Sequence, residues 1–147
     1  ESYVTREEFA KMISGALKLD AAEEPISFTD VDRDEWYAPY ISSAAAAGLV
    51  RGYADGSFGI GKSITREEAA VLISRAAVNA GKNTSPSSES GLSFTDAEDI
   101  SEFAAEGVKG CVELKIIQGN DNNMFLPNNS ITRAECAKMI CCLLDII

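Results

Sequence analysis

The sequence has 147 residues, about the length of one domain, and 46% of them are hydrophobic, enough for a core of its own. Lysine plus arginine is 13 against 23 aspartates plus glutamates, a net charge of −10 that argues against nucleic-acid binding, because neutralising phosphates needs a basic surface. The chain has no histidine, which excludes Ser-His-Asp and Cys-His catalytic sites, histidine-ligated metals and an imidazole pH switch.

The first predicted element is an amphipathic helix that follows Thr5. Thr5 and Glu8 have the spacing of a capping box, in which the threonine oxygen accepts from an amide of the first turn and the glutamate bonds back to the threonine amide. Apolar residues then recur with the period of one helical face over residues 9–17. Because the chain opens inside this pattern, we expect it to be a piece of a longer protein.

A second helix is predicted over residues 36–47, after the segment Ser27-Phe28-Thr29-Asp30. Its inward positions are predicted to be Trp36, Ile41 and Ala44. Asp30 is expected to cap the turn or helix that follows it, and Gly48 to end the second helix. A tight turn at Asp55-Gly56 then leads to Phe58, which we expect to anchor the loop in the core.

The same landmarks return later in the chain. Thr65 and Thr132 start segments that match the one at Thr5, and each has a glutamate three residues on. Phe94-Thr95-Asp96 repeats the earlier segment, and a helix over residues 100–114 repeats the second helix, with Phe103, Val108 and Cys111 as its inward positions. Internal repetition of this kind is typical of stacked supersecondary units.

The repeats divide the chain into one partial and two complete units. Residues 1–20 form the second half of a unit, and residues 26–81 and 92–147 form the complete ones. Residues 82–91 are rich in serine and polar, which predicts a flexible linker. We expect an all-α fold with no strand longer than two or three residues, and no membrane-spanning segment, since no run of 18 apolar residues is present.

Four motifs follow one another in a fixed order and spacing: Phe-Thr-Asp-Val, the aromatic Trp36, Gly-Leu-Val-Arg-Gly-Tyr-Ala-Asp-Gly-Ser-Phe and Ile-Thr-Arg-Glu-Glu. This pattern resembles the S-layer homology (SLH) module, and the resemblance covers nearly the whole chain. The resemblance implies SLH-type helical repeats in a pseudo-threefold, three-pronged arrangement around a central helix bundle. It also implies non-covalent anchoring of a bacterial surface protein to the cell wall, through a pyruvylated secondary cell-wall polysaccharide held in grooves between modules.

The third unit departs from the SLH pattern, with Phe103 in place of Trp36 and Asn122-Asn123 in place of Asp55-Gly56. The resemblance therefore implies that its groove is degenerate. The first unit lacks its front half, which implies an incomplete groove there as well.

Arg6, Arg66 and Arg133 are the main candidate ligand-binding residues. Each is the first residue of a capped helix, where we expect its side chain to point away from the buried face. A guanidinium beside the positive end of a helix is suited to a carboxylate such as a pyruvate ketal or a uronic acid. The alternative is a surface ion pair with a neighbouring carboxylate such as Glu7.

Two aromatic residues complete the candidate site. Trp36 and Tyr53 are expected to stack on a sugar face. For Trp36 the sequence alone favours a core anchor, with partial exposure to the groove.

The four cysteines, Cys111, Cys136, Cys141 and Cys142, do not form C-x-x-C pairs, so a zinc ribbon is not expected. They are expected to be buried small apolar residues, with a Cys111–Cys136 disulfide as the alternative. We expect no metal, cofactor or catalytic residue, because each repeated acid has a capping or turn role. The weakest alternative is a glycosidase with paired carboxylates.

The sequence therefore predicts a non-catalytic, extracellular module at the bacterial cell surface that binds an anionic wall polysaccharide. Direct binding of peptidoglycan in a diderm envelope is one alternative. Another is a protein-assembly module that associates with itself or another chain through an exposed apolar helix face at residues 9–17.

Overall fold

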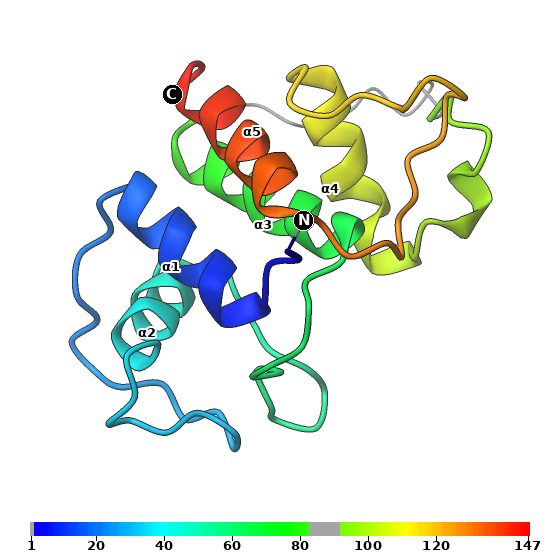
Figure 1. Cartoon of the computed structure of the whole chain (residues 1–147). Coiled ribbons are helices and arrows are strands. Elements are labelled where there is room, and N and C mark those ends of the chain that lie inside the picture. The colour runs from blue at the N-terminus through cyan, green and yellow to red at the C-terminus, as the bar shows by residue number, and fades with distance from the viewer. Residues whose placement is uncertain (1, 83–91) are drawn as a thin grey trace.

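The computed structural model describes residues 2–82 and 92–147 and is all-helical over them (Figure 1). The elements are α1 (Arg6–Ala16), α2 (Ala38–Ala46), α3 (Arg66–Asn79), a 3-10 turn η1 (Ala97–Asp99), α4 (Glu102–Glu113) and α5 (Arg133–Leu144). Over these residues extended pairing is confined to isolated bridges, as predicted. None of the helices described is long and apolar enough to cross a membrane. The predicted linker lies outside the described residues except for Lys82.

The three repeated helices start as the sequence predicts. Thr5, Thr65 and Thr132 each accept a hydrogen bond from the amide three residues on, and the glutamate at that position bonds back to the threonine amide. All three capping boxes are therefore confirmed. Each box satisfies backbone donors that would otherwise be unpaired at a helix start, and so fixes where α1, α3 and α5 begin.

The residues just before these three helices form a closed ring of backbone hydrogen bonds. The amide of Val4 donates to Ile131 O at 3.0 Å, the amide of Ile131 to Ile64 O at 3.2 Å, and the amide of Ile64 to Val4 O at 2.9 Å. All three side chains are buried. The ring joins three segments far apart in the sequence in one repeating pattern, as expected for a pseudo-threefold arrangement of SLH type.

The other two helices pack on the outside of this centre. α2 packs against α1, and α4 packs against α3, while α5 contacts α3 and α1 (Figure 1). Over the described residues α5 has no flanking helix equivalent to α2 or α4. The molecule therefore consists of two helix pairs and one unpaired helix around a common centre.

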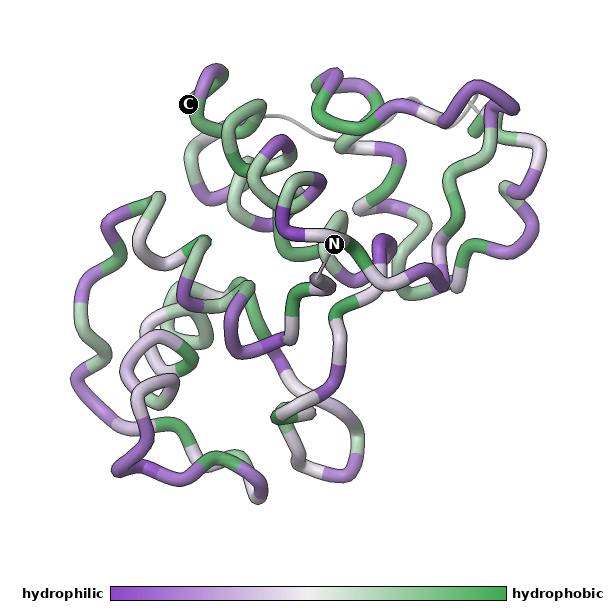
Figure 2. Tube along the Cα trace, in the orientation of Figure 1, coloured by the Kyte–Doolittle hydropathy of each residue, from purple (hydrophilic) through white to green (hydrophobic). Residues whose placement is uncertain are grey.

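The core is built from the repeated apolar positions. Hydrophobic and hydrophilic residues alternate along the helices, as expected for helices with one buried side (Figure 2). Phe58 is buried, which confirms the predicted loop anchor, and its counterpart Phe125 is buried as well. α3 buries more than the one predicted face, including Ala70 and Val71, because α4 packs on its far side and α5 also contacts it.

The inward positions of the second helix are only partly as predicted. Ile41 and Ala44, and their counterparts Val108 and Cys111, are fully buried. Trp36 and Phe103, however, are 48% and 63% exposed, so their prediction as core residues is wrong. The reason for Trp36 is that α2 begins at Ala38, which leaves the tryptophan in the turn before the helix and off its buried face.

The apolar face of the first helix is not exposed. Phe9 and Ile13 are fully buried, and α2 and α5 both contact α1. The expectation of an uncovered face at residues 9–17 is therefore wrong, because the chain itself supplies the helices that cover it.

Candidate functional site

Each of the three repeated arginines pairs with the capping-box glutamate of another repeat. Arg6 contacts Glu68 at 2.7 Å. Arg66 contacts Glu135 at 3.2 Å, and Arg133 contacts Glu8 at 3.3 Å. The pairs run from α1 to α3, from α3 to α5 and from α5 back to α1. The ion pairs thus follow the pseudo-threefold arrangement of the backbone ring.

This pairing follows from helix geometry. In each repeat the arginine and glutamate are two residues apart, a spacing at which side chains on one helix do not face each other. The glutamate is also held over its own helix start by the capping box, so its second oxygen faces the neighbouring repeat. The alternative of a local pair with Glu7 is wrong. So is the expectation that Arg6 points outward, because Arg6 is buried between repeats.

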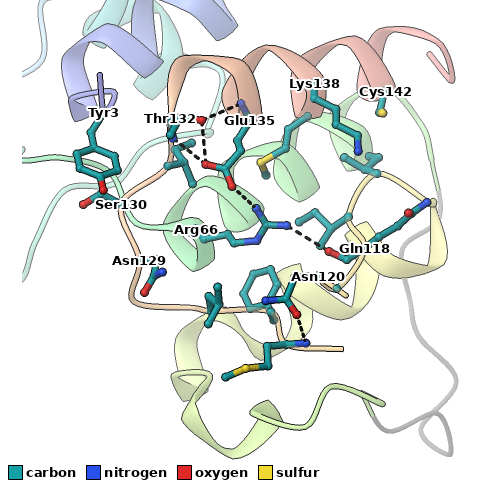
Figure 3. Close-up of a pocket in the computed structure, with 18 of the residues that line it drawn as sticks. Tyr3, Arg66, Gln118, Asn120, Asn129, Ser130, Thr132, Glu135, Lys138 and Cys142 are labelled. Carbon is teal, nitrogen blue, oxygen red and sulfur yellow. Dashed lines mark hydrogen bonds and ion pairs between the residues drawn. The ribbon is translucent and has the colours of Figure 1, made fainter. Parts of the chain in front are cut away.

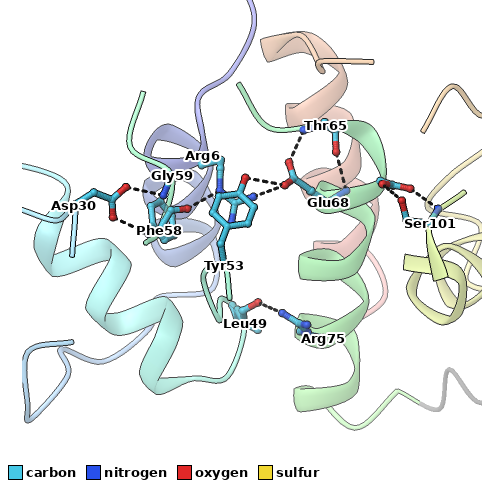
Figure 4. A network of polar contacts seen from close by, with 11 residues as sticks. Arg6, Asp30, Leu49, Tyr53, Phe58, Gly59, Thr65, Glu68, Arg75 and Ser101 are labelled. Atoms are coloured by element: carbon cyan, nitrogen blue, oxygen red, sulfur yellow. Dashed lines mark hydrogen bonds and ion pairs between the residues drawn. The ribbon is translucent and has the colours of Figure 1, made fainter. Parts of the chain in front are cut away.

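Arg6 lies in a groove of about 580 Å³ between α3 and the loop after α2. Its Nε donates to Phe58 O at 2.8 Å, and its guanidinium lies 4.6 Å from the centre of the Tyr53 ring (Figure 4). The Tyr53 hydroxyl donates to Glu68 at 3.1 Å. Burial raises the pKa of Tyr53 above its ordinary value of about 10, at which a phenol is already protonated at neutral pH. The exposed ring of Phe103 forms part of the groove lining.

The close fit of Arg6 against Tyr53 depends on Gly59. This residue has a φ of +95°, and a Cβ there would lie 2.7 Å from the Tyr53 ring and 3.1 Å from Cδ of Arg6. Glycine is the residue that adopts this left-handed backbone without strain and leaves the space free. The turn before the second capped helix is therefore shaped to admit the arginine of the first.

Asp30 holds this turn, which corrects its predicted role. It accepts hydrogen bonds from the amides of Phe58, Gly59 and Ile60 at 2.6 to 2.9 Å, far along the chain, and caps no helix that follows it. Burial raises the pKa of Asp30, but the three amides together outweigh this and leave the pKa below its ordinary value. Asp96 does the same in the next unit, with the amides of Phe125 and Leu126.

Arg66 lies in a second groove, of about 430 Å³. Its Nη1 contacts Glu135, its Nη2 donates to Gln118 O at 3.2 Å, and its guanidinium lies 5.4 Å from the Phe125 ring (Figure 3). Asn120 takes the place that Tyr53 has in the first groove, and Tyr3 also lines this second groove. Burial lowers the pKa of Arg66, and Glu135 only partly offsets this.

Arg133 is the most open of the three arginines, with more than half of its side chain exposed. Trp36 lies against α1, the helix that carries Glu8, the partner of Arg133. The Lys11 ammonium is 5.3 Å from the tryptophan ring, and Lys11 is one helical turn beyond Glu8, the partner of Arg133. Trp36 also packs edge-on against Tyr37.

The structure therefore brings together only some of the predicted site residues. Arg6 and Tyr53 are in direct contact, whereas Arg66 lies in a separate groove. Trp36 lies on the α1 side that carries Glu8, the partner of Arg133, and not beside Tyr53. The predicted residues thus belong to three places around the ring, one for each arginine.

Sequence reasoning missed the second role of the capping glutamates and two further arginines. Capping is the only predicted role of Glu8, Glu68 and Glu135. Each of them lies two residues after an arginine that it cannot face on its own helix, which indicates that the arginine has its partner in another segment. Arg51 and Arg75 line the Arg6 groove. A signal for Arg75 was available, since it follows Glu68 by seven residues and so shares its helical face.

The four cysteines are free in this structure, without the alternative Cys111–Cys136 disulfide, and Cys111 and Cys136 have separate partners. Cys111 Sγ donates to Ala70 O at 3.3 Å, and Cys136 Sγ lies 3.6 Å from Met12 Sδ. Cys142 lines the Arg66 groove, and Cys141 is exposed. The prediction of buried apolar residues is right for Cys111 and Cys136 and wrong for Cys141, which α5 directs to solvent.

The profile of the S-layer homology domain matches residues 27–70 and 93–137, more than half of the chain. The chain is 33% identical over 141 residues to an endoglucanase of Bacillus sp. (strain KSM-635), covering 96% of this chain and 15% of that protein. It is 37% identical over 145 residues to the exoglucanase XynX of Acetivibrio thermocellus, covering 97% of this chain and 13% of that protein. A cellulosome-anchoring protein of that species is 31% identical over 146 residues, covering 95% of this chain and 32% of that protein. The chain thus spans a small part of each relative.

Proposed function

Because the chain belongs to the S-layer homology domain family, we propose that it anchors its protein to the cell wall by binding an anionic, pyruvylated secondary wall polysaccharide. The family is one of bacterial cell-surface proteins, and the chain is a cell-surface module. We carry no catalytic activity over from the two glucanases, because the aligned part is 15% and 13% of their lengths. The proposed module holds a polymer and does no chemistry on it.

The observation that supports this proposal is the repeated guanidinium at a helix start. In two grooves it lies against an aromatic ring, Tyr53 for Arg6 and Phe125 for Arg66. A guanidinium has five N–H donors, and the protein bonds of Arg66 use two of them. Donors therefore remain for a carboxylate, and the helix N-terminus adds a partial positive charge. We propose Arg6, Arg66 and Arg133 as the residues that bind the acidic groups, with Tyr53 and Trp36 against sugar faces.

Calorimetry with purified wall polysaccharide tests the proposal. We expect wild type to bind, and Arg66→Gln to weaken binding at least about tenfold, which is about 1.4 kcal/mol. Arg33→Gln is the matched control, because it removes the same charge from an exposed residue that lines neither groove. No heat with wild type, or equal affinity for Arg66→Gln and Arg33→Gln, would contradict the proposal.

A pull-down separates the wall polymer from peptidoglycan. Hydrofluoric acid strips the secondary polysaccharide from isolated sacculi and leaves peptidoglycan. Loss of binding after stripping supports the polysaccharide. Unchanged binding to stripped sacculi would replace it with peptidoglycan as the ligand.

A second candidate function, protein assembly, is favoured by the open side of α5. α1 and α3 each carry a flanking helix, while over the described residues α5 carries none and exposes Leu144. We propose this face as the site of association with another helix, in place of residues 9–17. Light scattering of wild type against Leu144→Asp tests it. A concentration-independent monomer for both proteins would rule it out.

A further inference from the structure

The Arg6 groove continues along α3 to a second pair of cationic side chains, Arg51 and Arg75. Arg75 follows Glu68 by seven residues, so both lie on the α3 face toward Tyr53, about 10 Å apart along the helix axis (Figure 4). Arg75 Nη1 donates to Leu49 O at 2.9 Å, and Arg51 follows Leu49 by two residues. The groove thus has one cationic centre at Arg6 and another farther along.

The second centre has no carboxylate of its own. Over the described residues neither Arg51 nor Arg75 forms an ion pair. The two glutamates of the lining are engaged elsewhere, since Glu67 accepts from the amide and hydroxyl of Ser101, and Glu68 accepts from Arg6 and Tyr53.

The charges at this centre repel each other. Burial lowers the pKa of Arg75, and the nearby charge of Arg51 lowers it further. Two unpaired guanidiniums in one groove are unfavourable for the protein alone, and a bound anion would offset this. In a chain of net charge −10, they gather positive charge in one place.

The pair of arginines is specific to one groove. In the next unit the residue equivalent to Arg51 is Gln118, and the residue equivalent to Arg75 is Cys142, and both line the Arg66 groove. Both grooves have the repeated arginine and its glutamate. Only the Arg6 groove has the additional pair of arginines, whereas the Arg66 groove is lined by Lys115 and Lys138 at other positions of the repeat. The difference indicates a ligand contact that the repeat as such does not require.

We propose that Arg51 and Arg75 form a second anion subsite, which binds a further carboxylate or phosphate of a polyanionic glycan whose first acidic group lies at Arg6. The proposal rests on the proposed function and adds that the ligand carries charges on more than one sugar. The exposed ring of Phe103, which lines the same groove, would pack against a sugar between the two charges.

The first test uses the wall polysaccharide and four proteins: wild type, Arg51→Gln, the double variant Arg51→Gln/Arg75→Gln, and Arg33→Gln. We expect the double variant to bind at least about tenfold more weakly than Arg33→Gln, which has an ordinary surface charge removed. Arg51 is exposed, so Arg51→Gln will fold even if the Arg75 change disturbs the contact with Leu49. Affinities for Arg51→Gln and the double variant equal to that of Arg33→Gln would overturn the proposal while leaving the anchoring function intact.

The second test does not depend on the identity of the wall polymer. Inorganic pyrophosphate, with two linked anionic groups, is titrated into ¹⁵N-labelled protein, and the Nε–H signals of Arg75 and Arg51 are followed by NMR. We expect saturable shifts of these signals, which Arg51→Gln weakens and Arg33→Gln does not. Signals that stay unmoved would overturn the subsite. If they shift while the wall polysaccharide fails to bind wild type, the subsite stands and the proposed function fails.

Discussion

Arg6 at the start of α1 donates to Glu68 at 2.7 Å, although 62 residues separate the two. Glu68 also closes the capping box of α3, so one carboxylate fixes a helix start and joins two repeats. Because the same relation recurs twice more around the centre, the short motif Thr-Arg-x-Glu encodes both a helix start and a contact between repeats. The motif is thus structural as well as a candidate for ligand binding.

The three arginines should differ in their effect on stability, because their exposure differs. The side chains of Arg6 and Glu68 are 9% and 15% exposed, and those of Arg133 and Glu8 are 56% and 35% exposed. We expect Arg6→Gln to lower the free energy of unfolding by about 3–5 kcal/mol, since it leaves a buried carboxylate without its partner. Arg133→Gln should lower it by about 0–1 kcal/mol. Urea denaturation measures both.

A double variant provides the control for this comparison. Arg6→Gln/Glu68→Gln removes both charges, so it should cost less than the two single changes added together. Simple additivity would indicate that Arg6 stabilises the fold through its bond to Phe58 and its ring contacts, and not through the ion pair.

The loss of stability at acid pH should depend on Asp96. Burial raises the pKa of this group, but the amides of Phe125 and Leu126 outweigh it and leave the pKa below its ordinary value. Because this pKa is lowered, the ionised Asp96 carboxylate stabilises the folded protein above the unfolded-state pKa of about 3.9. This stabilisation is lost as the pH falls through the folded-state pKa. We expect Asp96→Asn to destabilise the protein by about 1.5–3 kcal/mol at pH 7. The difference in the free energy of unfolding between this variant and wild type should shrink below about pH 4. A difference that stays constant from pH 7 down to acid would contradict this assignment.

Features that depend on neighbours in sequence were predictable, and those that depend on the packing of distant segments were not. The capping boxes, the end of α2 and the anchor Phe58 each follow from residues a few positions apart. Asp30 looked like a helix cap because its type and place suit one, yet its partners lie 28 to 30 residues away. Nothing local distinguishes an aspartate that caps the next turn from one that binds a distant loop.

The candidate site was predictable in its parts but not in its grouping. The repeated arginines were found from the repeat itself. That Tyr53 contacts Arg6 and not Arg66 follows from how the loop after α2 meets α1 and α3, which the sequence does not state. The exposure of Trp36 is greater than the partial exposure predicted, because α2 starts two residues later than the sequence predicts.

The packing of α4 on α3 should be sensitive to Gly107. A Cβ at this position would lie 3.0 Å from Cα of Val71 and 3.3 Å from its Cγ2, so the two helices would have to move apart. We expect Gly107→Ala to lower the free energy of unfolding by about 1–2 kcal/mol, the cost of overpacking exceeding the gain in helix propensity. Gly15→Ala is the matched control, since a Cβ there meets nothing within 4 Å and should stabilise α1 by about 0.5–1 kcal/mol. Equal effects of the two changes would contradict the close approach of α4 to α3.

The four cysteines should react with alkylating reagents at very different rates. Burial raises the pKa of Cys111 and of Cys136 to about 12, so both remain thiols at pH 8, and neither side chain is accessible. Cys141 is exposed on α5. Because the thiolate is the reactive form, we expect iodoacetamide to modify Cys141 first in native protein, and Cys111 and Cys136 only when the fold opens. Mass spectrometry of digested samples taken over time measures each site.

Cys141→Ser provides the control for this order. The variant should lose the fast modification, and Cys111 and Cys136 should keep their slow rates. Addition of urea should raise those slow rates in step with the unfolded fraction, because their protection comes from the fold. Fast modification of Cys111 in native conditions would mean that α4 separates from α3 far more often than their packing implies, since its thiol lies against Ala70 between these two helices.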